Sequence, residues 1–200
     1  RLGKCSRTGD IIEPMLKPQW WLDCSSMAKR ATDAVRNGEL KIMPQEHEKT
    51  WFKWLDNIRD WCISRQLWWG HRIPAYYVKM RGKELKEPVV AASDAEAVEL
   101  VVAAHGCTMA EVELRRDEDV LDTWFSSGLW PFATVGWPGN DEASLKEYNR
   151  FYPSSVMETG YDILFFWVAR MVMLSLQLTD KLPFTQVYLH AMVRDKKGRK

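Results

Sequence analysis

The sequence predicts an α/β fold with a parallel sheet, and the strongest indication lies near its carboxyl end. There a strand segment at 155–158 is followed by a glycine turn, an apolar helical stretch at 162–178 and a second strand segment at 185–193. Such a strand–helix–strand unit joins two parallel strands. The composition agrees with a globular chain that buries a substantial core, because 46% of the 200 residues are hydrophobic and 28% are charged.

Charge and cysteine content exclude several classes of protein. The 28 Lys and Arg side chains oppose 27 Asp and Glu, whereas nucleic-acid coats and membrane-surface peptides carry a large basic excess. The four cysteines include no C-x-x-C pair, so neither a disulfide framework nor a zinc ribbon is indicated, and a reducing compartment is the default. The apolar stretch at 163–178 contains polar interruptions and is shorter than a bilayer span, so we interpret it as a buried helix.

Apolar spacing predicts two helices ahead of the carboxyl-terminal unit. The first begins at Asp23, where apolar residues recur on one face until an Asn-Gly pair supplies a stop. The second begins after Pro44 and places four apolar residues at helical spacing: Trp51, Trp54, Leu55 and Ile58. Strand character follows at 61–65 and at 75–78.

Composition divides the chain into four parts. Residues 81–118 are charged, rich in Ala and Val, and free of tryptophan, and they contain a helix opened by a Ser93-x-x-Glu96 capping box and closed by Gly106. The parts are a leading ribbon at 1–22, a helical segment at 23–80, a small insertion at 81–118 and a final α/β part at 119–200. A polar loop is expected at 136–150. Since the first residue is not Met and the last lies in a basic turn, we interpret the chain as an excerpt of a longer protein.

Gly160 and Asp162 form the first candidate site, at the switch from strand to helix. Ligands of open parallel sheets bind at the carboxyl ends of strands, where a glycine allows close approach and an aspartate accepts hydrogen bonds from ribose hydroxyls. In the alternative interpretation, Gly160 serves only the turn and Asp162 only caps the helix. The local pattern leaves both interpretations open.

Aromatic and imidazole side chains provide further candidates. The segment 119–128 combines carboxylates and hydroxyls with Trp124, which suits the apolar floor of a pocket, although a core tryptophan fits the pattern as well. The same two interpretations apply to Trp68, Trp69 and Trp167. Two imidazoles are candidate acid–base or phosphate-binding groups, or else structural: His71 and His190.

Four blocks occur together in an order that is typical of one enzyme family. They span 61–74, 119–128, 158–171 and 189–200. Through these blocks the chain, from about Thr8 to Lys200, closely resembles the middle of class I valyl-tRNA synthetases. The string Trp-Trp-Gly-His in the first block and the string Asp-Ile-Leu-Phe-Phe-Trp in the third favour the valyl branch over the isoleucyl and leucyl branches.

The resemblance implies the second half of a Rossmann-type catalytic domain, with the first half upstream. It assigns 1–22 to the exit ribbon of an editing insertion and 81–118 to a small connective insertion. In that family ATP and valine give valyl-adenylate and pyrophosphate, and the valyl group then passes to the terminal adenosine of the tRNA. The implied partners are ATP accompanied by Mg²⁺, L-valine and tRNA(Val), with no membrane.

The resemblance also implies roles for single residues. Gly160 and Asp162 contact the adenylate, with Asp162 near the ribose or the ammonium group of the amino acid. The walls of the valine side-chain pocket are Trp124, Ile163 and Trp167. His190 is a candidate nucleotide contact. Lys200 is the first lysine of the KMSKS loop, which stabilises charge on the triphosphate as pyrophosphate leaves.

Some features of the family are missing or left open. Several relatives carry paired cysteines for zinc between 79 and 118, whereas only Cys107 is present here, so we expect no zinc or other bound metal. The pocket excludes isoleucine by size but not threonine, so editing is implied, with its residues upstream of Arg1. The isolated piece is expected to be inactive, and the default location is cytoplasmic, with a mitochondrial copy left open. The alternatives are an isoleucyl-type synthetase and a non-catalytic tRNA-binding scaffold.

Overall fold

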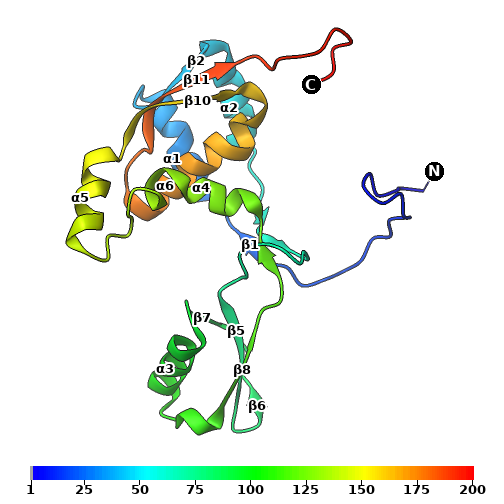
Figure 1. Cartoon of the computed structure of the whole chain (residues 1–200), viewed down its shortest axis with the longest axis vertical. Coiled ribbons are helices and arrows are strands. Elements are labelled where there is room, and N and C mark those ends of the chain that lie inside the picture. The colour runs from blue at the N-terminus through cyan, green and yellow to red at the C-terminus, as the bar shows by residue number, and fades with distance from the viewer. Residues whose placement is uncertain (1) are drawn as a thin grey trace.

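The computed structural model describes residues 2–200, which form a larger α/β lobe and a smaller β-rich lobe joined by short antiparallel ribbons (Figure 1). The larger lobe contains a three-stranded sheet in the order β10 (Ser154–Gly160), β11 (Phe184–His190) and β2 (Lys41–Met43). Both strand pairs are parallel, which confirms the predicted fold class. The short strand β2 was not foreseen, and it ends where Pro44 has no N–H to offer a neighbouring strand.

The crossover from β10 to β11 is a single helical run, Tyr161–Thr179. It starts with a 3-10 turn (Tyr161–Ile163), passes through a π-helical turn (Leu164–Ala169) and continues as α6 (Arg170–Thr179). The run is longer than the stretch expected from the sequence, and by length and composition it is able to span a membrane, which corrects the expectation that it is too short. Within the fold, 56% of its most apolar window is buried. Core helices have the same composition, so this feature alone is weak evidence for a membrane.

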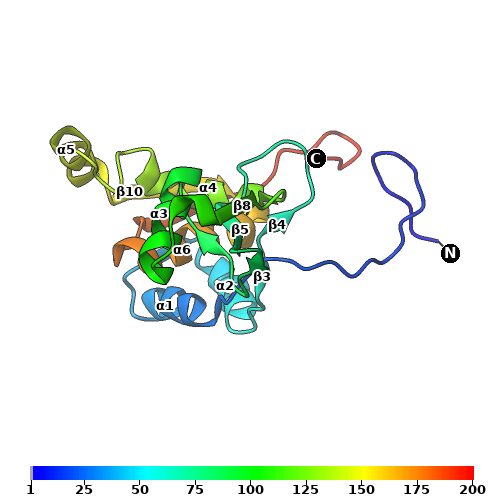
Figure 2. The ribbon, with the colours of Figure 1, turned by 90° about the horizontal axis from the view of Figure 1, so that it is seen from below.

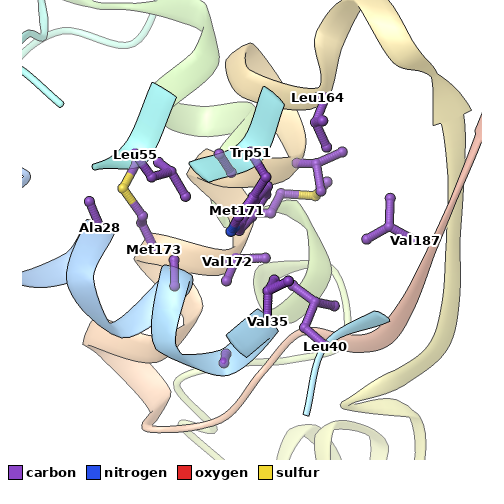
Figure 3. Close-up of a cluster of buried hydrophobic side chains, with 14 of the residues drawn as sticks. Ala28, Val35, Leu40, Trp51, Leu55, Leu164, Met171, Val172, Met173 and Val187 are labelled. Carbon is purple, nitrogen blue, oxygen red and sulfur yellow. The ribbon is translucent and has the colours of Figure 1, made fainter. Parts of the chain in front are cut away.

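The main core lies between the sheet and three helices. These helices are α1 (Ser25–Arg36), α2 (Glu48–Leu55, after the 3-10 turn η1, Gln45–His47) and α6. Figure 3 shows Trp51 and Leu55 of α2 directed at Val172 and Met173 of α6, with Val35 of α1 in the same cluster. The buried side of the sheet adds Ile42, Phe184, Val187 and Leu189. The other face exposes Val156 and Tyr188 around a hollow of about 740 Å³.

Two further helices complete the larger lobe. The helix α4 (Thr123–Ala133) packs against α6, and the backbones approach closely because Gly128 has no Cβ, which would lie 2.7 Å from Leu174 Cδ1. The helix α5 (Glu142–Phe151) occupies part of the segment that we expected to be a loop. That prediction was wrong because Asp141 caps this helix by accepting a hydrogen bond from the Ser144 N–H (2.7 Å).

The smaller lobe is built around β5 (Ala75–Met80). This strand pairs antiparallel with β6 (Lys83–Glu84), β7 (Val89–Val90) and β8 (Val112–Arg116). The helix α3 (Asp94–His105) covers the sheet, followed by the 3-10 turn η2 (Met109–Glu111). The predicted cap is confirmed in part. Ser93 Oγ accepts from the Glu96 N–H, whereas the Glu96 carboxylate accepts from the Ala92 N–H, one residue ahead of the N-cap.

Two short ribbons connect the lobes. The strand β1 (Trp21–Leu22) pairs with β3 (Trp61–Cys62), and β4 (Ser64–Arg65) pairs with β9 (Val120–Leu121), both antiparallel. Ahead of β1, the chain from residue 2 runs outward from both lobes, as the two perpendicular views show (Figures 1 and 2). The ribbons therefore place the segments 61–65 and 119–122 side by side between the lobes.

Candidate active site

Gly160 and His190 lie opposite each other at the carboxyl ends of two neighbouring parallel strands. Gly160 is buried with a φ of −64°, which any residue adopts, so the turn itself does not require glycine. A Cβ would lie 2.5 Å from Met192 Sδ and 2.7 Å from Asp162 Oδ1, so both side chains would have to move. The glycine therefore leaves room for the Asp162 carboxylate in its observed position.

The Asp162 carboxylate forms an ion pair with the Lys200 ammonium. This hydrogen bond, helped by the charge of His190, holds the pKa of the Asp162 carboxyl below its usual range. The carboxylate is thus ionised at neutral pH and already accepts a primary ammonium group. Sequence reasoning treated Asp162 and Lys200 separately, and the structure brings the two together from 38 residues apart.

His190 is held between two acceptors at the same strand edge. Its Nε2 lies 3.2 Å from Glu158 Oε1, and its Nδ1 lies 3.0 Å from the carbonyl oxygen of Ala191. The imidazole is exposed. This position is compatible with contact to a nucleotide, and Glu158 is a further polar group there that sequence reasoning did not single out.

The predicted apolar walls come from two helices in contact. Trp124, in the first turn of α4, lies with its ring centroid 6.2 Å from that of Phe166. The indole Nε1 of Trp167 donates to the carbonyl oxygen of Ser127 in α4 (3.0 Å). Ile163 is half-buried at the junction between the 3-10 and π-helical turns. Trp124 and Trp167 therefore both lie where α4 meets the crossover helix, whereas Ile163 directly follows Asp162 in the chain.

A buried charge cluster fixes these two helices to each other. Asp122 and Arg170 are 6% and 8% exposed, and Arg170 Nη1 lies 3.1 Å from Asp122 Oδ2. The indole Nε1 of Trp61 donates to the same oxygen (3.0 Å), and its ring lies 3.8 Å below the Arg170 guanidinium. Arg65 reaches the second oxygen at 3.4 Å.

Sequence reasoning missed this cluster, although one signal was available. A charged residue within an apolar helical stretch, as Arg170 is, requires a buried partner. Burial lowers the pKa of Arg170, and the Asp122 carboxylate opposes that effect. Since Asp122 precedes α4 and Arg170 belongs to the crossover helix, the pair links the two helices that carry Trp124 and Trp167.

No metal centre is visible in the described part of the chain. Within residues 2–200 no group of three or more His, Cys, Asp and Glu side chains is arranged to hold a metal ion. Cys107 is instead buried in the small lobe, where it packs against Val78 and Val101. The absence of zinc stays a prediction, which metal analysis of the purified protein would measure.

Gly160→Ala is expected to weaken the synthetase activity that the sequence resemblance implies while leaving the protein folded. The added Cβ would displace the Asp162 carboxylate, and a misplacement of about 1 Å costs on the order of 100-fold in rate. The control is Ser155→Ala, which alters an exposed position of β10, the strand that ends at Gly160. Gly38→Ala is not a suitable control, because the backbone φ of +75° at Gly38 disfavours alanine. Normal activation by Gly160→Ala, measured as pyrophosphate exchange, would contradict the close-approach role.

Comparison with known proteins identifies the class to which this fold and site belong. The family described as tRNA synthetases class I (I, L, M and V) matches residues 6–200. The chain therefore belongs to the class I aminoacyl-tRNA synthetase family. The fold agrees, since methionyl-tRNA synthetase of Mycobacterium tuberculosis, solved with methionyl-adenylate, superposes with a TM-score of 0.64 at 14% identity, over 98% of this chain and 31% of that chain.

The similar sequences belong to one branch of this family. The chain is 53% identical to valine–tRNA ligase of Rattus norvegicus and 52% identical to that of Homo sapiens, each over 98% of this chain and 16% of the relative. A mitochondrial valine–tRNA ligase of Saccharomyces cerevisiae is 53% identical over 98% of this chain and 18% of its own length. The chain thus spans about a sixth of the length of these relatives.

Proposed function

We propose that the protein containing this chain is a valine–tRNA ligase. The observation that carries the proposal is 52–54% identity to five animal enzymes of that name over 98% of the chain. In the first reaction the carboxylate of valine attacks the α-phosphate of ATP, forming valyl-adenylate and releasing pyrophosphate. In the second reaction the valyl group passes to the terminal adenosine of tRNA(Val), and AMP leaves.

Asp162 binds the ammonium group of valine or a ribose hydroxyl of the adenylate. Its ion pair with Lys200 supports this role, because a carboxylate that holds one primary ammonium can hold another. Valine binding then releases Lys200, which becomes available to the triphosphate as pyrophosphate forms. Gly160 leaves space for the ligand, and His190 contacts the nucleotide from the neighbouring strand end.

Magnesium enters only as the counter-ion of ATP. Residues 2–200 provide no cluster of three or more metal-ligating side chains, and Asp162 is already neutralised by Lys200. We therefore assign no resident metal to this chain, and no step of the reaction is derived through one. Charge on the leaving phosphates is stabilised from this chain by Lys200.

The valine pocket is formed by Trp124, Ile163 and Trp167. Two indoles and one β-branched side chain exclude isoleucine by size, yet they reject threonine weakly because threonine has nearly the shape of valine. We therefore expect the protein to need an editing activity. The partners are L-valine, ATP and tRNA(Val). The cytoplasm is the default location of the protein. A mitochondrial location is the alternative, because one of the relatives is a mitochondrial enzyme.

Trp167→Ala is expected to raise the ratio of isoleucine to valine activation. Removing the indole enlarges the pocket by more than the volume of the one methylene by which isoleucine exceeds valine. Discrimination of one methylene in an apolar pocket amounts to about 10- to 200-fold in selectivity. The measurement is kcat/KM for pyrophosphate exchange with each amino acid. Trp130→Ala, at a 54% exposed position of α4, serves as the matched control. An unchanged ratio in Trp167→Ala would contradict the pocket assignment.

The proposed function itself is tested by ATP–pyrophosphate exchange on the full-length protein. Valine, isoleucine, leucine and threonine are compared side by side, and strong exchange with valine plus weaker exchange with threonine is expected. Preferential exchange with isoleucine would move the protein to the isoleucyl branch. Exchange with none of the four would favour the non-catalytic scaffold.

A further inference from the structure

The chain ahead of β1 first forms hydrogen bonds with the rest of the protein at residues 17–20, which we name the anchor segment. Residues 2–16 run outward from both lobes, and nearly all of them are exposed (Figures 1 and 2). Their hydrogen bonds join them to one another, around a bridge between Lys4 and Ile11. Within residues 2–200, no hydrogen bond or ion pair connects 2–16 to the chain that follows. The anchor segment therefore determines where this part of the chain leaves the fold.

Asp117, directly after β8 of the smaller lobe, receives hydrogen bonds from three parts of the chain. Its carboxylate is buried, with the residue 7% exposed. Its Oδ2 accepts from the indole Nε1 of Trp20 in the anchor segment (2.9 Å) and from the hydroxyl of Tyr77 in β5 (3.0 Å). Its Oδ1 accepts from the Asp119 N–H (2.9 Å). One buried carboxylate thus joins the anchor segment to the smaller lobe and to the chain that enters β9.

Further bonds attach the anchor segment at both of its ends. Asp119 is also buried, and its Oδ1 lies 2.9 Å from Lys17 Nζ. The Trp20 N–H donates to Ser64 Oγ (2.9 Å), and the Trp20 carbonyl oxygen accepts from the Ile63 N–H (2.9 Å). The two backbone bonds of Trp20 therefore report whether the segment is in place.

The anchor segment does not pack tightly against the smaller lobe. A hollow of about 570 Å³ lies between them, with Lys17, Trp20, Tyr77 and Asp117 in its lining. Burial disfavours the ionised form of Asp117, but the hydrogen bonds from Trp20, the Asp119 N–H and Tyr77 outweigh this effect and hold the pKa of its carboxyl below its usual range. The attachment thus depends on a charged acceptor, and such acceptors form the stronger hydrogen bonds.

We propose that Asp117 is a positioning residue for editing, because it fixes the direction in which the chain ahead of the anchor segment leaves the fold. The inference rests on the proposed function, which is expected to need editing and in which residues 1–22 are the exit ribbon of an editing insertion. In editing, water cleaves the ester bond of Thr-tRNA(Val) at a second site and gives threonine and free tRNA. The placement of that second site affects this reaction, whereas activation of valine uses Gly160 and Asp162 of the larger lobe.

The test compares two reactions of the full-length protein. Valine-dependent pyrophosphate exchange measures activation, and release of threonine from preformed Thr-tRNA(Val) measures editing. Asp117→Ala is expected to slow threonine release by about 10-fold or more, because a misplacement of about 1 Å costs on the order of 100-fold in rate. Its kcat/KM for pyrophosphate exchange should stay close to the wild-type value.

Two single-bond variants separate attachment of the anchor segment from other effects. Trp20→Phe keeps an aromatic ring but removes the N–H that reaches Asp117, so it should slow threonine release as well, though less than Asp117→Ala does. Tyr77→Phe removes the other donor to the same oxygen and is the matched control. It should leave both reactions unchanged, because the Asp117 N–H still ties this residue to the Ala75 carbonyl oxygen of the smaller lobe (2.9 Å).

Hydrogen exchange of the same variants measures whether the anchor segment is released. The N–H groups of Trp20 and Ile63 form its two backbone bonds. Both should exchange faster in Asp117→Ala and at the corresponding positions of Trp20→Phe, but not in Tyr77→Phe, because local opening exposes them to water.

Several results would overturn the inference. Unchanged exchange at Trp20 and Ile63 in Asp117→Ala would show that the carboxylate does not hold the segment, and faster exchange with normal threonine release would show that its placement does not affect editing. Equal losses in both reactions with a lowered melting temperature would assign Asp117 to stability alone. If Asp117→Ala does not fold, Trp20→Phe and Tyr77→Phe are compared by the same criteria.

Failure of the proposed function has a different result. Absence of valine-dependent pyrophosphate exchange in the wild-type protein would refute the ligase, while the hydrogen-exchange comparison would still show whether Asp117 holds the anchor segment. Normal pyrophosphate exchange without any threonine release by the wild-type protein would retain the ligase and overturn the role of Asp117 in editing.

Discussion

Asp162→Ala is expected to reduce valine-dependent pyrophosphate exchange by roughly 100- to 1000-fold, the range seen when one preorganised electrostatic contact to a reacting group is removed. The lowered pKa keeps the Asp162 carboxyl ionised at neutral pH, so the wild-type protein presents a full negative charge to its ligand. Alanine removes both the charge and the acceptor. Exchange kinetics at several valine concentrations measure the loss, and near-normal activation would contradict the assigned role.

Asp162→Asn distinguishes the two ligands proposed for this carboxylate. An amide oxygen still accepts a hydrogen bond from a ribose hydroxyl, but it no longer pairs with an ammonium charge. Substantial recovery by asparagine therefore indicates the ribose, and failure to recover indicates the ammonium group of valine. Because Asp162 is paired with the exposed side chain of Lys200, both variants should keep the wild-type melting temperature.

Asp122→Ala is expected to destabilise the larger lobe by about 3–5 kcal/mol, because it leaves the buried Arg170 guanidinium without its carboxylate partner. The Trp61 indole loses its acceptor at the same time. Denaturant titration gives the overall loss, and hydrogen exchange of α4 and α6 shows where it occurs. Less than about 1 kcal/mol would mean that water replaces the carboxylate and that the pair does not position the helices.

Two controls accompany this measurement. Asp56→Ala breaks the exposed ion pair with Arg36 and should cost no more than about 1 kcal/mol. The double variant Asp122→Leu/Arg170→Met replaces the buried charges by apolar groups and should recover much of the loss. If stability returns while the isoleucine-to-valine ratio stays altered, the pair acts on the orientation of Trp124 and Trp167 as well as on folding.

The parallel unit was predictable because its information is local. A strand segment, a glycine turn, an apolar helix and a second strand segment follow each other between residues 155 and 193. The right-handedness of such crossovers then determines how these elements pack. The helix at 94–105 was predictable for the same reason, since Ser93 and Glu96 cap it within one turn. In both cases each determinant lies within a few residues of the element that it specifies.

The remaining features depend on contacts between distant residues. The strand β2 has only three residues, and it exists because β11, far along the chain, offers a parallel edge. The pairing of Asp162 with Lys200 and of Asp122 with Arg170 likewise joins residues 38 and 48 positions apart. The family resemblance supplied roles for the site residues, but neither it nor the local pattern indicated these partners.

The π-helical turn at Leu164–Ala169 lies between the polar and the apolar parts of the candidate site. Asp162 comes before this turn, whereas Trp167 lies within it. One residue corresponds to about 100° of rotation in an ordinary helix. Losing a single residue from this turn would thus swing the indole around the helix axis while the carboxylate stayed at the end of β10. An insertion or deletion in this turn could therefore change which amino-acid side chain fits the pocket. Asp162, which is proposed to bind a group common to all amino acids or their adenylates, would stay in place.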